Sequence, residues 1–384
     1  MSQLANVVAS LTHGQAERTV RGLLELADIR VGGDRPQDIQ VHDPAFYVRV
    51  LRDGRLGVGE SYVEGEWDAV QLDHFIARVL EARLNERVQD WRSMLYVAAA
   101  RASNFQKVSR AFRSVERHYD IGNDLYEAML GETWAYTCAY WTGASTLDQA
   151  QRAKFELVCR KLELRPGMKV LELGCGWGSF AKFAAEHYGA EVTGYTLSNE
   201  QIAVGRQLCQ GLPVDLRLQD YRLATGSFDR VLSIGMMEHV GHKNHRTYFE
   251  TVDRCLKPGG IAFVHTIGSN VSETLIDSFY HKYLFPNALI PSLAQLAQAM
   301  EGLFVPEDVH NIGPHYDATL MAWHSNFVAA WPTLSTRYNE RFRRLWRFYL
   351  LSSAGSFRAR FTQLYQIVLT RPGTAQPARP VIAA

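Results

Sequence analysis

The sequence predicts an α/β protein with a doubly wound, mainly parallel β-sheet and a small N-terminal α/β domain. From Gly167 onward, short apolar runs alternate with helical patterns, and strands separated by helices form right-handed βαβ crossovers. The first hundred residues lack this alternation. The chain has 384 residues, 47% of them hydrophobic, which fits one large or two ordinary domains. We therefore expect a small domain over residues 1–105 and a larger one over residues 106–384.

Within the smaller domain, helical and extended patterns follow one another over short stretches. Apolar spacing predicts an amphipathic helix over residues 16–27, a short strand region over 39–51 and a second helix over 71–84. The Gly-rich segment 54–59 predicts turns between the strand region and the second helix.

In the larger domain, five short apolar runs predict the parallel strands, with helices between them. These runs are residues 169–173, 191–195, 214–218, 230–234 and 261–265. A β-branched run over 363–370 predicts a last strand at the edge of the sheet.

The composition narrows the classes of function. Lys and Arg total 41 against 40 Asp and Glu, so the net charge of +1 gives no reason to expect a nucleic-acid partner. No apolar stretch has the length of a membrane span, and the start of the chain lacks the pattern of a signal peptide. We therefore expect a cytoplasmic protein. The five cysteines lie far apart, which predicts reduced thiols.

Two stretches are locally basic. Four residues share one helical face by their spacing: Lys107, Arg110, Arg113 and Arg117. Four arginines also lie between residues 341 and 347, interleaved with aromatic residues. Such stretches suit an anionic lipid surface. The alternative is a solvated helix face with acidic neighbours from elsewhere in the fold.

A Gly-rich turn follows the first predicted strand directly and opens a helix over 179–187. Residues 170–178 are Val-Leu-Glu-Leu-Gly-Cys-Gly-Trp-Gly. Glycines let backbone N–H groups approach a ligand at the switch point of an open α/β sheet. The G-x-G-x-G spacing, with the acid Glu172 before the first Gly, is typical of S-adenosylmethionine-dependent methyltransferases. An NAD-binding loop is the alternative.

The next two strands add candidate cofactor contacts. The second strand ends without the acid that usually binds ribose hydroxyls, and Gln201 can replace that acid with a neutral amide. Asp220 follows the third strand, where an adenine amino group would need an acceptor.

Several other residues allow both a structural and a functional interpretation. Cys138 alone is typical of a small buried residue, and His265 of a buried, hydrogen-bonded histidine. His239, His242 and His245 recur every three residues, but no cysteine or fourth ligand accompanies them, so we predict no metal site. Four aromatic residues fit either the core or a surface that faces a cation: Tyr136, Tyr140, Trp141 and Trp323.

Eight segments, in order along the chain, resemble the cyclopropane-fatty-acyl-phospholipid synthase family. They are residues 118–124, 136–141, 170–178, 196–201, 219–221, 238–241, 265–268 and 316–323. Residues 56–62 also resemble the small lipid-engaging domain of that family. The similarity covers essentially the whole chain and implies a Rossmann-like methyltransferase fold for the larger, catalytic domain.

The resemblance implies transfer of a methylene group from S-adenosylmethionine to the cis double bond of an unsaturated acyl chain in membrane phospholipid. A base must remove a proton from the new methyl group so that the cyclopropane ring closes. The family implies a bound bicarbonate as this base. Its implied ligands are the backbone at Cys138 and Ile267 and the side chains of Glu238, His265 and Tyr316.

The resemblance also implies the cofactor contacts, position by position. They are Tyr136 and Thr137 near the methionine part, Gly174 and Gly176 under it, Thr196 and Gln201 at the ribose, and Asp220 and Tyr221 at the adenine. Three positions depart from the family pattern. Thr137 replaces a usual Ser, His242 replaces a usual Pro, and Ser353 stands where some relatives have Cys.

The implied partner is the surface of a phospholipid bilayer with unsaturated acyl chains. The family further implies a homodimer and a peripheral location on the inner face of the cytoplasmic membrane. Three alternatives stay open: methylation of acyl chains without ring closure or of another lipid, a lipid-surface binding protein with a vestigial cofactor fold, and an NAD-dependent oxidoreductase.

Overall fold

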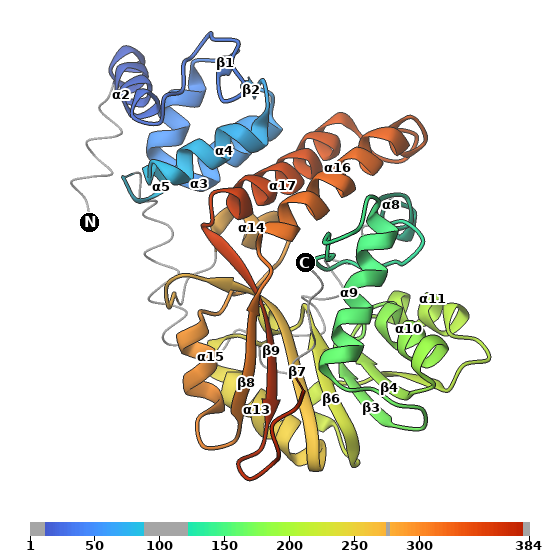
Figure 1. Ribbon diagram of the computed structural model, residues 1–384. Helices are drawn as coiled ribbons and strands as arrows, with labels where there is room; N and C mark the ends of the chain where they lie inside the picture. The colour runs from blue at the N-terminus through green and yellow to red at the C-terminus, as the bar shows by residue number, and fades with distance from the viewer. Residues whose placement is uncertain (1–11, 88–121, 274–276, 379–384) are drawn as a thin grey trace. The chain divides into compact units, whose positions relative to one another are not determined.

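The chain forms two compact units, each assembled from several segments. The structure is a computed structural model that describes residues 12–87, 122–273 and 277–378. The described part of the first unit consists of residues 12–87, 277–286 and 320–362 (Figure 1). The second unit contains the other described residues. The predicted boundary at residue 105 lies outside the described ranges, but the first unit also includes two later segments that we did not expect there.

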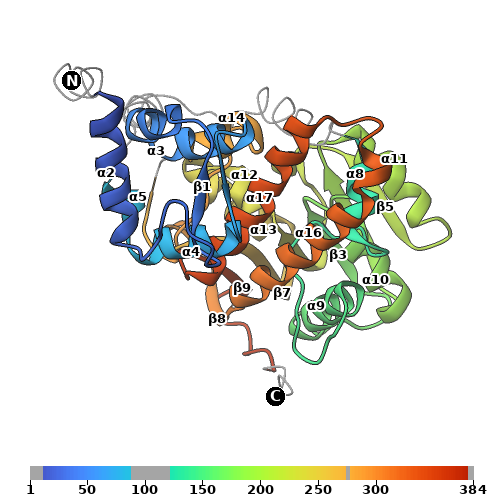
Figure 2. The same cartoon turned by 90° about the horizontal axis from the view of Figure 1, so that it is seen from above.

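Helices dominate the first unit. In chain order its elements are α2 (His13–Glu25), β1 (Ile39–Val41), α3 (Ala45–Val63), β2 (Trp67–Ala69), α4 (Leu72–Glu81), α5 (Leu84–Arg87), α14 (Ser278–Tyr283), α16 (Pro314–Leu334) from Leu320 onward, and α17 (Glu340–Arg358). The long α17 lies beside α4 (Figures 1 and 2). Among the described residues, no helix combines the length and apolar character that crossing a membrane requires.

The two helices predicted near the N-terminus are confirmed, but the segment between them differs from the prediction. Only β1 is extended within the predicted strand region 39–51, and α3 then runs through the predicted turns at 54–59. Gly54 has a φ of 54° and kinks α3 without ending it. Apolar residues such as Phe46, Val50 and Leu56 are buried along α3, so tertiary packing outweighs the low helix propensity of the glycines.

Three of the four arginines in 341–347 contact acidic residues of their own unit. Arg341 pairs with Glu64 at 3.0 Å, and Arg343 pairs with Glu340 at 3.2 Å. Arg344 pairs with Asp68 at 2.9 Å and also donates to two backbone carbonyls. This stretch therefore follows the alternative interpretation, a helix face with acidic neighbours. The other basic face, with Lys107, Arg110, Arg113 and Arg117, lies outside the described residues.

The second unit is built on a seven-stranded sheet in the order β5-β4-β3-β6-β7-β9-β8. The first five strands in this order are parallel: β5 (Val214–Leu218), β4 (Glu191–Thr196), β3 (Lys169–Leu173), β6 (Phe228–Ile234) and β7 (Leu256–Ser269). The chain moves from β3 outward to β5 and then returns to β6 on the other side of β3. The ends of β3 and β6 therefore form the switch point where open α/β sheets bind ligands.

All five predicted parallel strands are confirmed, whereas the predicted edge strand is wrong in its position. β9 (Thr362–Thr370) forms as expected but lies between β7 and β8 (Val305–Asn311). The antiparallel β8 forms the edge instead. Its sequence, Val-Pro-Glu-Asp-Val-His-Asn, alternates little and is largely solvent-accessible, so it carried no strand signal.

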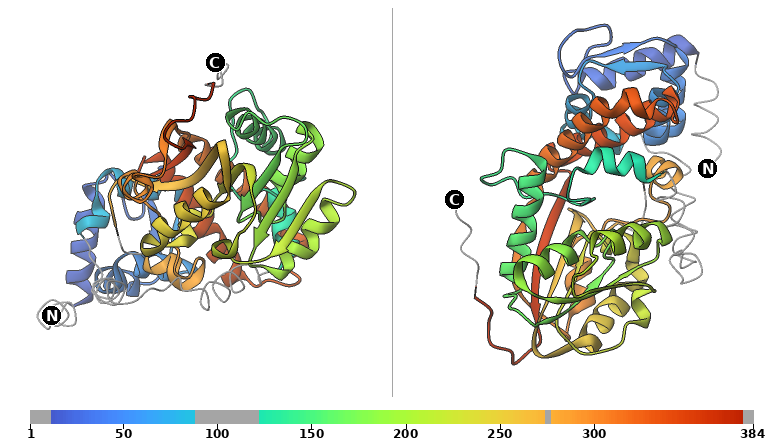
Figure 3. Two further views of the ribbon diagram at one scale, coloured as in Figure 1. Left: turned by 90° about the horizontal axis from the view of Figure 1, so that it is seen from below. Right: turned by 90° about the vertical axis from the view of Figure 1, so that its right-hand side faces the viewer.

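Two apolar cores cover the two faces of this sheet, with helices on both sides (Figure 3). Leu171 and Leu173 of β3 belong to one core with α13 (His245–Cys255) and α15 (Leu293–Met300). Val170 belongs to the other core with α9 (Leu147–Lys161) and α10 (Ser179–Tyr188). Since side chains alternate along a strand, Glu172 of β3 and His265 of β7 face the α9 side.

Candidate active site

The loop between β3 and α10 is shaped by left-handed glycines. Gly174, Gly176 and Gly178 have φ values of 80°, 55° and 78°, which L-amino acids with side chains rarely adopt. A Cβ atom on Gly176 would meet no atom within 4 Å. Both Gly174 and Cys175 donate their N–H groups to Tyr195 O at 2.9 Å, which ties the loop to β4. The open space at Gly176 fits a ligand that approaches the backbone closely.

Glu172, near the end of β3, contacts the helix that follows this loop. Its side chain is 2% exposed and accepts a hydrogen bond from the Ala181 N–H in the first turn of α10. A carboxylate is favourable at the positive end of a helix. Burial nevertheless raises the pKa of Glu172 to about 8, because the charged form loses its hydration.

The side chains predicted at the ribose lie together at the end of β4. Thr196 Oγ1 donates to Gln201 Oε1 at 2.7 Å, and both residues are buried. Gln201 lies in the first turn of α11 (Asn199–Leu208), where Ser198 caps the helix by accepting from the Gln201 N–H. The contact fixes the orientation of the Gln201 amide.

The pair predicted at the adenine follows β5 in the short helix η1 (Tyr221–Leu223). The Asp220 carboxylate accepts from Arg222 Nε at 2.8 Å and from a second guanidinium nitrogen at 2.6 Å. This arginine contact was not expected from the sequence. The Tyr221 ring is buried, and burial raises the pKa of its hydroxyl to about 12.

The segment 135–138 lies over the end of β6. Gln151 of α9 donates to Ala135 O at 3.2 Å and to Thr137 O at 2.8 Å, which fixes the backbone of this segment. The Thr137 methyl group would be 2.7 Å from a Cβ atom on Gly235, so glycine is required directly after β6. Tyr136 packs edge-on against Tyr126 of α8 (Asn123–Leu130), with ring centroids 5.2 Å apart.

Cys138 and Tyr316 are brought near each other by hydrogen bonds of their neighbours. The Ala139 N–H donates to Thr319 Oγ1 at 3.1 Å, and the Trp141 N–H donates to His315 Nδ1 at 3.0 Å. His315 and Thr319 flank Tyr316 in the part of α16 that belongs to the second unit. Cys138 is fully buried, and burial raises the pKa of its thiol far above the usual value. Any role in ligand binding therefore falls to its backbone.

Glu238 lies in the short helix α12 (Met237–Val240), directly after β6. Its Oε1 accepts from the Ile267 N–H at 2.6 Å. Its Oε2 is buried and has no hydrogen-bond partner among the described residues. Burial raises the pKa of Glu238 to about 7, so the proton-bearing form is well populated at neutral pH.

His265 lies on β7, paired in the ladder with Ile234 at the end of β6. Its Nδ1 is 3.3 Å from Gln366 Nε2 of β9, and its Nε2 has no partner among the described residues. Burial and the nearby Lys154 and Lys161 lower the pKa of His265 well below the usual value. The imidazole is therefore neutral.

We call the residues predicted to bind the base the polar cluster: Cys138, Glu238, His265, Ile267 and Tyr316. His265 and Ile267 lie within β7, Glu238 follows β6, and Cys138 and Tyr316 are connected to each other through hydrogen bonds of their neighbours. The structure adds that the Ile267 N–H already donates to Glu238. Sequence reasoning missed Gln151, Lys154 and Gln366, which have polar side chains but are fully buried.

Two further sets of residues were discussed in the sequence analysis, Ser353 and the three histidines 239, 242 and 245. Ser353 belongs to the first unit, where its hydroxyl is 2.8 Å from the Tyr280 hydroxyl. His239, His242 and His245 are distributed over α12, η2 (His242–Asn244) and α13. In the described part of the chain, no three His, Cys, Asp or Glu residues are placed to hold a metal ion.

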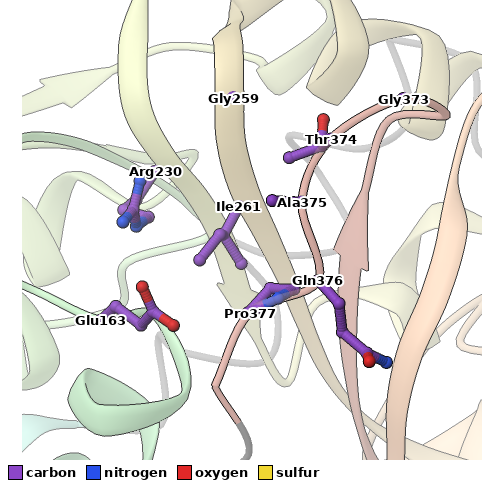
Figure 4. Close-up of a pocket in the computed structure, with 9 residues that line it drawn as sticks. All are labelled: Glu163, Arg230, Gly259, Ile261, Gly373, Thr374, Ala375, Gln376 and Pro377. Atoms are coloured by element: carbon purple, nitrogen blue, oxygen red, sulfur yellow. The ribbon is translucent and has the colours of Figure 1, made fainter.

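A pocket of about 430 Å³ lies at the opposite end of the sheet (Figure 4). Arg230 and Ile261, which pair across β6 and β7 near their amino ends, form one side. The C-terminal segment 373–377 forms another. This pocket is separate from the Gly-rich loop, since parallel strands place their carboxyl ends at the other edge.

Comparisons with known proteins agree with this geometry. The mycolic acid cyclopropane synthetase family model matches residues 106–367. Cyclopropane-fatty-acyl-phospholipid synthase from Escherichia coli K12 is 48% identical over 355 residues, which cover 92% of this chain and 93% of that protein. Among solved structures, cyclopropane synthase MmaA2 from Mycobacterium tuberculosis has a TM-score of 0.63 and 28% identity, covering 67% of this chain and 97% of its own.

A second solved structure is mycolic acid cyclopropane synthase CmaA1 in complex with SAH and CTAB. It has a TM-score of 0.62 and 30% identity, and the match covers 67% of this chain and 97% of that one. Both structural matches agree with the Rossmann-like fold.

Proposed function

Because the chain belongs to the mycolic acid cyclopropane synthetase family, it is an S-adenosylmethionine-dependent methyltransferase that forms cyclopropane rings on phospholipid acyl chains, and we propose that bicarbonate bound in the polar cluster is the base. The observation that carries this proposal is a pair of buried polar atoms, Glu238 Oε2 and His265 Nε2, which have no partner among the described residues. Buried polar atoms are nearly always hydrogen-bonded, so such a pair indicates a missing ligand.

The cofactor contacts are proposed from the geometry of the loops. The open backbone at Gly176 fits the methionine part, and the Thr196–Gln201 pair fits the ribose. When bound, S-adenosylmethionine supplies an electrophilic methyl group to the alkene. The aromatic residues Tyr136 and Tyr140 lie in the segment next to the polar cluster, where ring faces would attract the positive charge that develops on the acyl chain.

The protonation states of the cluster suit an anion. If the Gln366 amide donates to His265 Nδ1, the neutral imidazole has its proton on Nε2 and can donate it. A protonated Glu238 likewise donates from Oε2 while Oε1 accepts from the Ile267 N–H. The Tyr316 hydroxyl adds a further donor. Two or three donors to one oxyanion favour its bound, charged form.

Ring closure then needs one proton transfer. A C–H bond of the newly added methyl group breaks, its electron pair forms the third C–C bond of the ring, and its proton passes to an oxygen of bicarbonate. Carbonic acid leaves or loses the proton to solvent. A neutral His265 or a protonated Glu238 is a poor base by comparison, which supports an exogenous base.

Depletion of carbonate tests this proposal. Activity should fall when carbon dioxide and bicarbonate are rigorously removed, and it should return when bicarbonate is added at constant pH. Full activity in protein shown to be free of bound carbonate would exclude bicarbonate and leave His265 as the first candidate base. Proton NMR of the lipid product separates ring formation from simple methylation, because only the former gives cyclopropyl proton signals.

We also propose that the enzyme acts at the inner surface of the cytoplasmic membrane, where the small domain and a basic face at residues 107–117 of the larger domain engage phospholipid. The one-sided spacing of Lys107, Arg110, Arg113 and Arg117 supports a basic lipid-binding face. Replacing all four by Ser should weaken binding to anionic vesicles at low salt, and the difference should shrink at high salt. Unchanged binding at low salt would remove this face from the proposal. A homodimer is proposed on the family resemblance, and sedimentation equilibrium would measure it.

A further inference from the structure

Lys154 is a buried charged residue that the reaction described above does not use. It lies in the middle of α9, and none of its surface is exposed. Its Nζ donates to Thr137 Oγ1 at 2.9 Å. Burying an ammonium group is costly unless a specific contact compensates for it, so the position of this lysine requires an explanation.

The hydrogen bond sets the polarity of the Thr137 hydroxyl. In its protonated form Lys154 only donates, so Thr137 Oγ1 accepts and the hydroxyl proton points elsewhere. Among the described residues, Thr137 Oγ1 donates no hydrogen bond. Thr137 is only half-buried, in the segment that lies over the end of β6. The Thr137 hydroxyl group can therefore donate a hydrogen bond to a ligand at the edge of the proposed cofactor site.

The backbone of this segment is held independently of Lys154. Gln151, one turn earlier on α9, donates to the carbonyl groups of Ala135 and Thr137. Lys154 is thus not needed to hold the main chain, and its contact acts on the hydroxyl group. Burial lowers the pKa of Lys154 to about 7, while the nearby Glu172 raises it. A bound anion next to Thr137 would favour the charged form further.

We propose that Lys154 is a positioning residue that makes the Thr137 hydroxyl donate its proton to the carboxylate of the bound methyl donor. This inference rests on the proposed cofactor site, in which Thr137 lies at the methionine part. In this proposal Lys154 contributes to recognition of the carboxylate of the methyl donor through Thr137, without contacting the carboxylate itself.

Calorimetric binding of two ligands to the full chain, without lipid, tests the proposal. The ligands are S-adenosylmethionine and decarboxylated S-adenosylmethionine, which differ by one carboxylate. Wild-type protein should prefer the first. Lys154→Met should reduce this preference about two- to twelvefold, the range of one hydrogen bond, with little change for the decarboxylated ligand. An equal loss for both ligands would overturn the proposal.

A matched control is available on the same helix. Lys161 is 1% exposed and donates to Asp308 at 2.7 Å, so Lys161→Met also removes a buried lysine. It should lower the melting temperature and leave the preference between the two ligands unchanged. Loss of the preference in this control as well would show that it follows from general destabilisation of α9.

Variants of Thr137 remove the other partner of the same hydrogen bond and leave the sequence of α9 unchanged. Thr137→Val should abolish the preference, whereas Thr137→Ser should keep it. The double variant Lys154→Met/Thr137→Val should lose no more than Thr137→Val alone, because the two residues act through one contact. Additive losses, or a preference retained in Thr137→Val, would overturn the role of Lys154. If wild-type protein shows no preference at all, the proposed placement of Thr137 at the cofactor is wrong instead.

Discussion

The two ends of the parallel sheet differ in whether their buried polar groups have hydrogen-bond partners. At the amino end, Asp229 pairs with Lys257 at 2.8 Å, and the buried Arg230 donates to the carbonyl groups of Leu162 and Asp229. At the carboxyl end, Glu238 Oε2, His265 Nε2 and the Tyr221 hydroxyl have no partner among the described residues. The paired groups at the amino end connect β6 to β7 and to the end of α9. Unpaired groups at the carboxyl end cost stability and are available for a ligand.

The largest expected effect is the pH dependence of the free energy of unfolding that results from ionisation of Glu238. Its pKa is raised from 4.5 to about 7 in the folded protein. Its contribution to stability is therefore fully present below about pH 4.5 and is lost as pH rises through about 7. The loss is on the order of 3 kcal/mol. Glu238→Gln, which cannot ionise, should be more stable than wild type at pH 8, with a smaller difference at pH 5.

Denaturant unfolding in carbonate-free buffer at both pH values measures this difference, since bicarbonate would add its own stabilisation to the wild type. A Glu238→Gln protein that is less stable than wild type at pH 8 would show that this carboxyl group is paired after all.

Glu238→Ala, which removes the donor at Oε2, should cut turnover at least tenfold, because a hydrogen bond to a charged group is worth about 1.5 to 3 kcal/mol. Affinity for S-adenosylmethionine should stay within about threefold, since Glu238 is proposed to bind the base. Steady-state kinetics and calorimetry measure the two quantities. Lost cofactor binding with unchanged turnover would place Glu238 at the cofactor.

Arg230→Met is the matching change at the amino end. It leaves two carbonyl groups without their donor and should lower the free energy of unfolding by about 1 to 3 kcal/mol. Turnover per folded molecule should not change, because Arg230 lines the separate pocket of Figure 4. If fully folded Arg230→Met protein lost turnover, the amino end would not be purely structural and the contrast between the two ends would be wrong.

The smallest effect is expected for Tyr316→Phe, which removes one neutral donor and keeps the ring. The bicarbonate concentration for half-maximal activity should rise about two- to twelvefold, corresponding to about 0.5 to 1.5 kcal/mol. Titration of carbonate-depleted enzyme measures it. An unchanged half-maximal concentration would remove the Tyr316 hydroxyl from the polar cluster.

The sequence predicted the carboxyl end better than the edges of the fold. Strand β3 was predicted to the residue, because a parallel strand buried on both faces has a continuous apolar run. Strand β8 could not be recognised, since its residues are half-buried or exposed and include a proline and two acidic residues. The two later segments of the first unit were missed because packing between segments distant in sequence leaves no local pattern.

In the candidate site, the sequence pointed to the motif residues but not to the buried polar residues that contact them. Lys154 was overlooked because a lysine in an amphipathic helix usually lies on the solvated face. Its spacing did carry a signal: Ala150, Lys154 and Val158 follow one another at intervals of four on the buried face of α9. Gln366 was hidden similarly within the apolar strand β9. The hydrogen bond of Gln366 depends on His265, 101 residues earlier in the chain, and that of Lys154 depends on Thr137, 17 residues earlier and outside α9.

The place of β9 in the sheet affects how the protein is made. This strand is synthesised after every other strand of the sheet, yet it fills the gap between β7 and β8. Until residue 370 leaves the ribosome, β7 lacks a neighbour on one side and β8 has no strand to pair with. Such unpaired strands are templates for aggregation. A nascent chain stalled before residue 362 should therefore depend on chaperones, although the entire Gly-rich loop has already been translated.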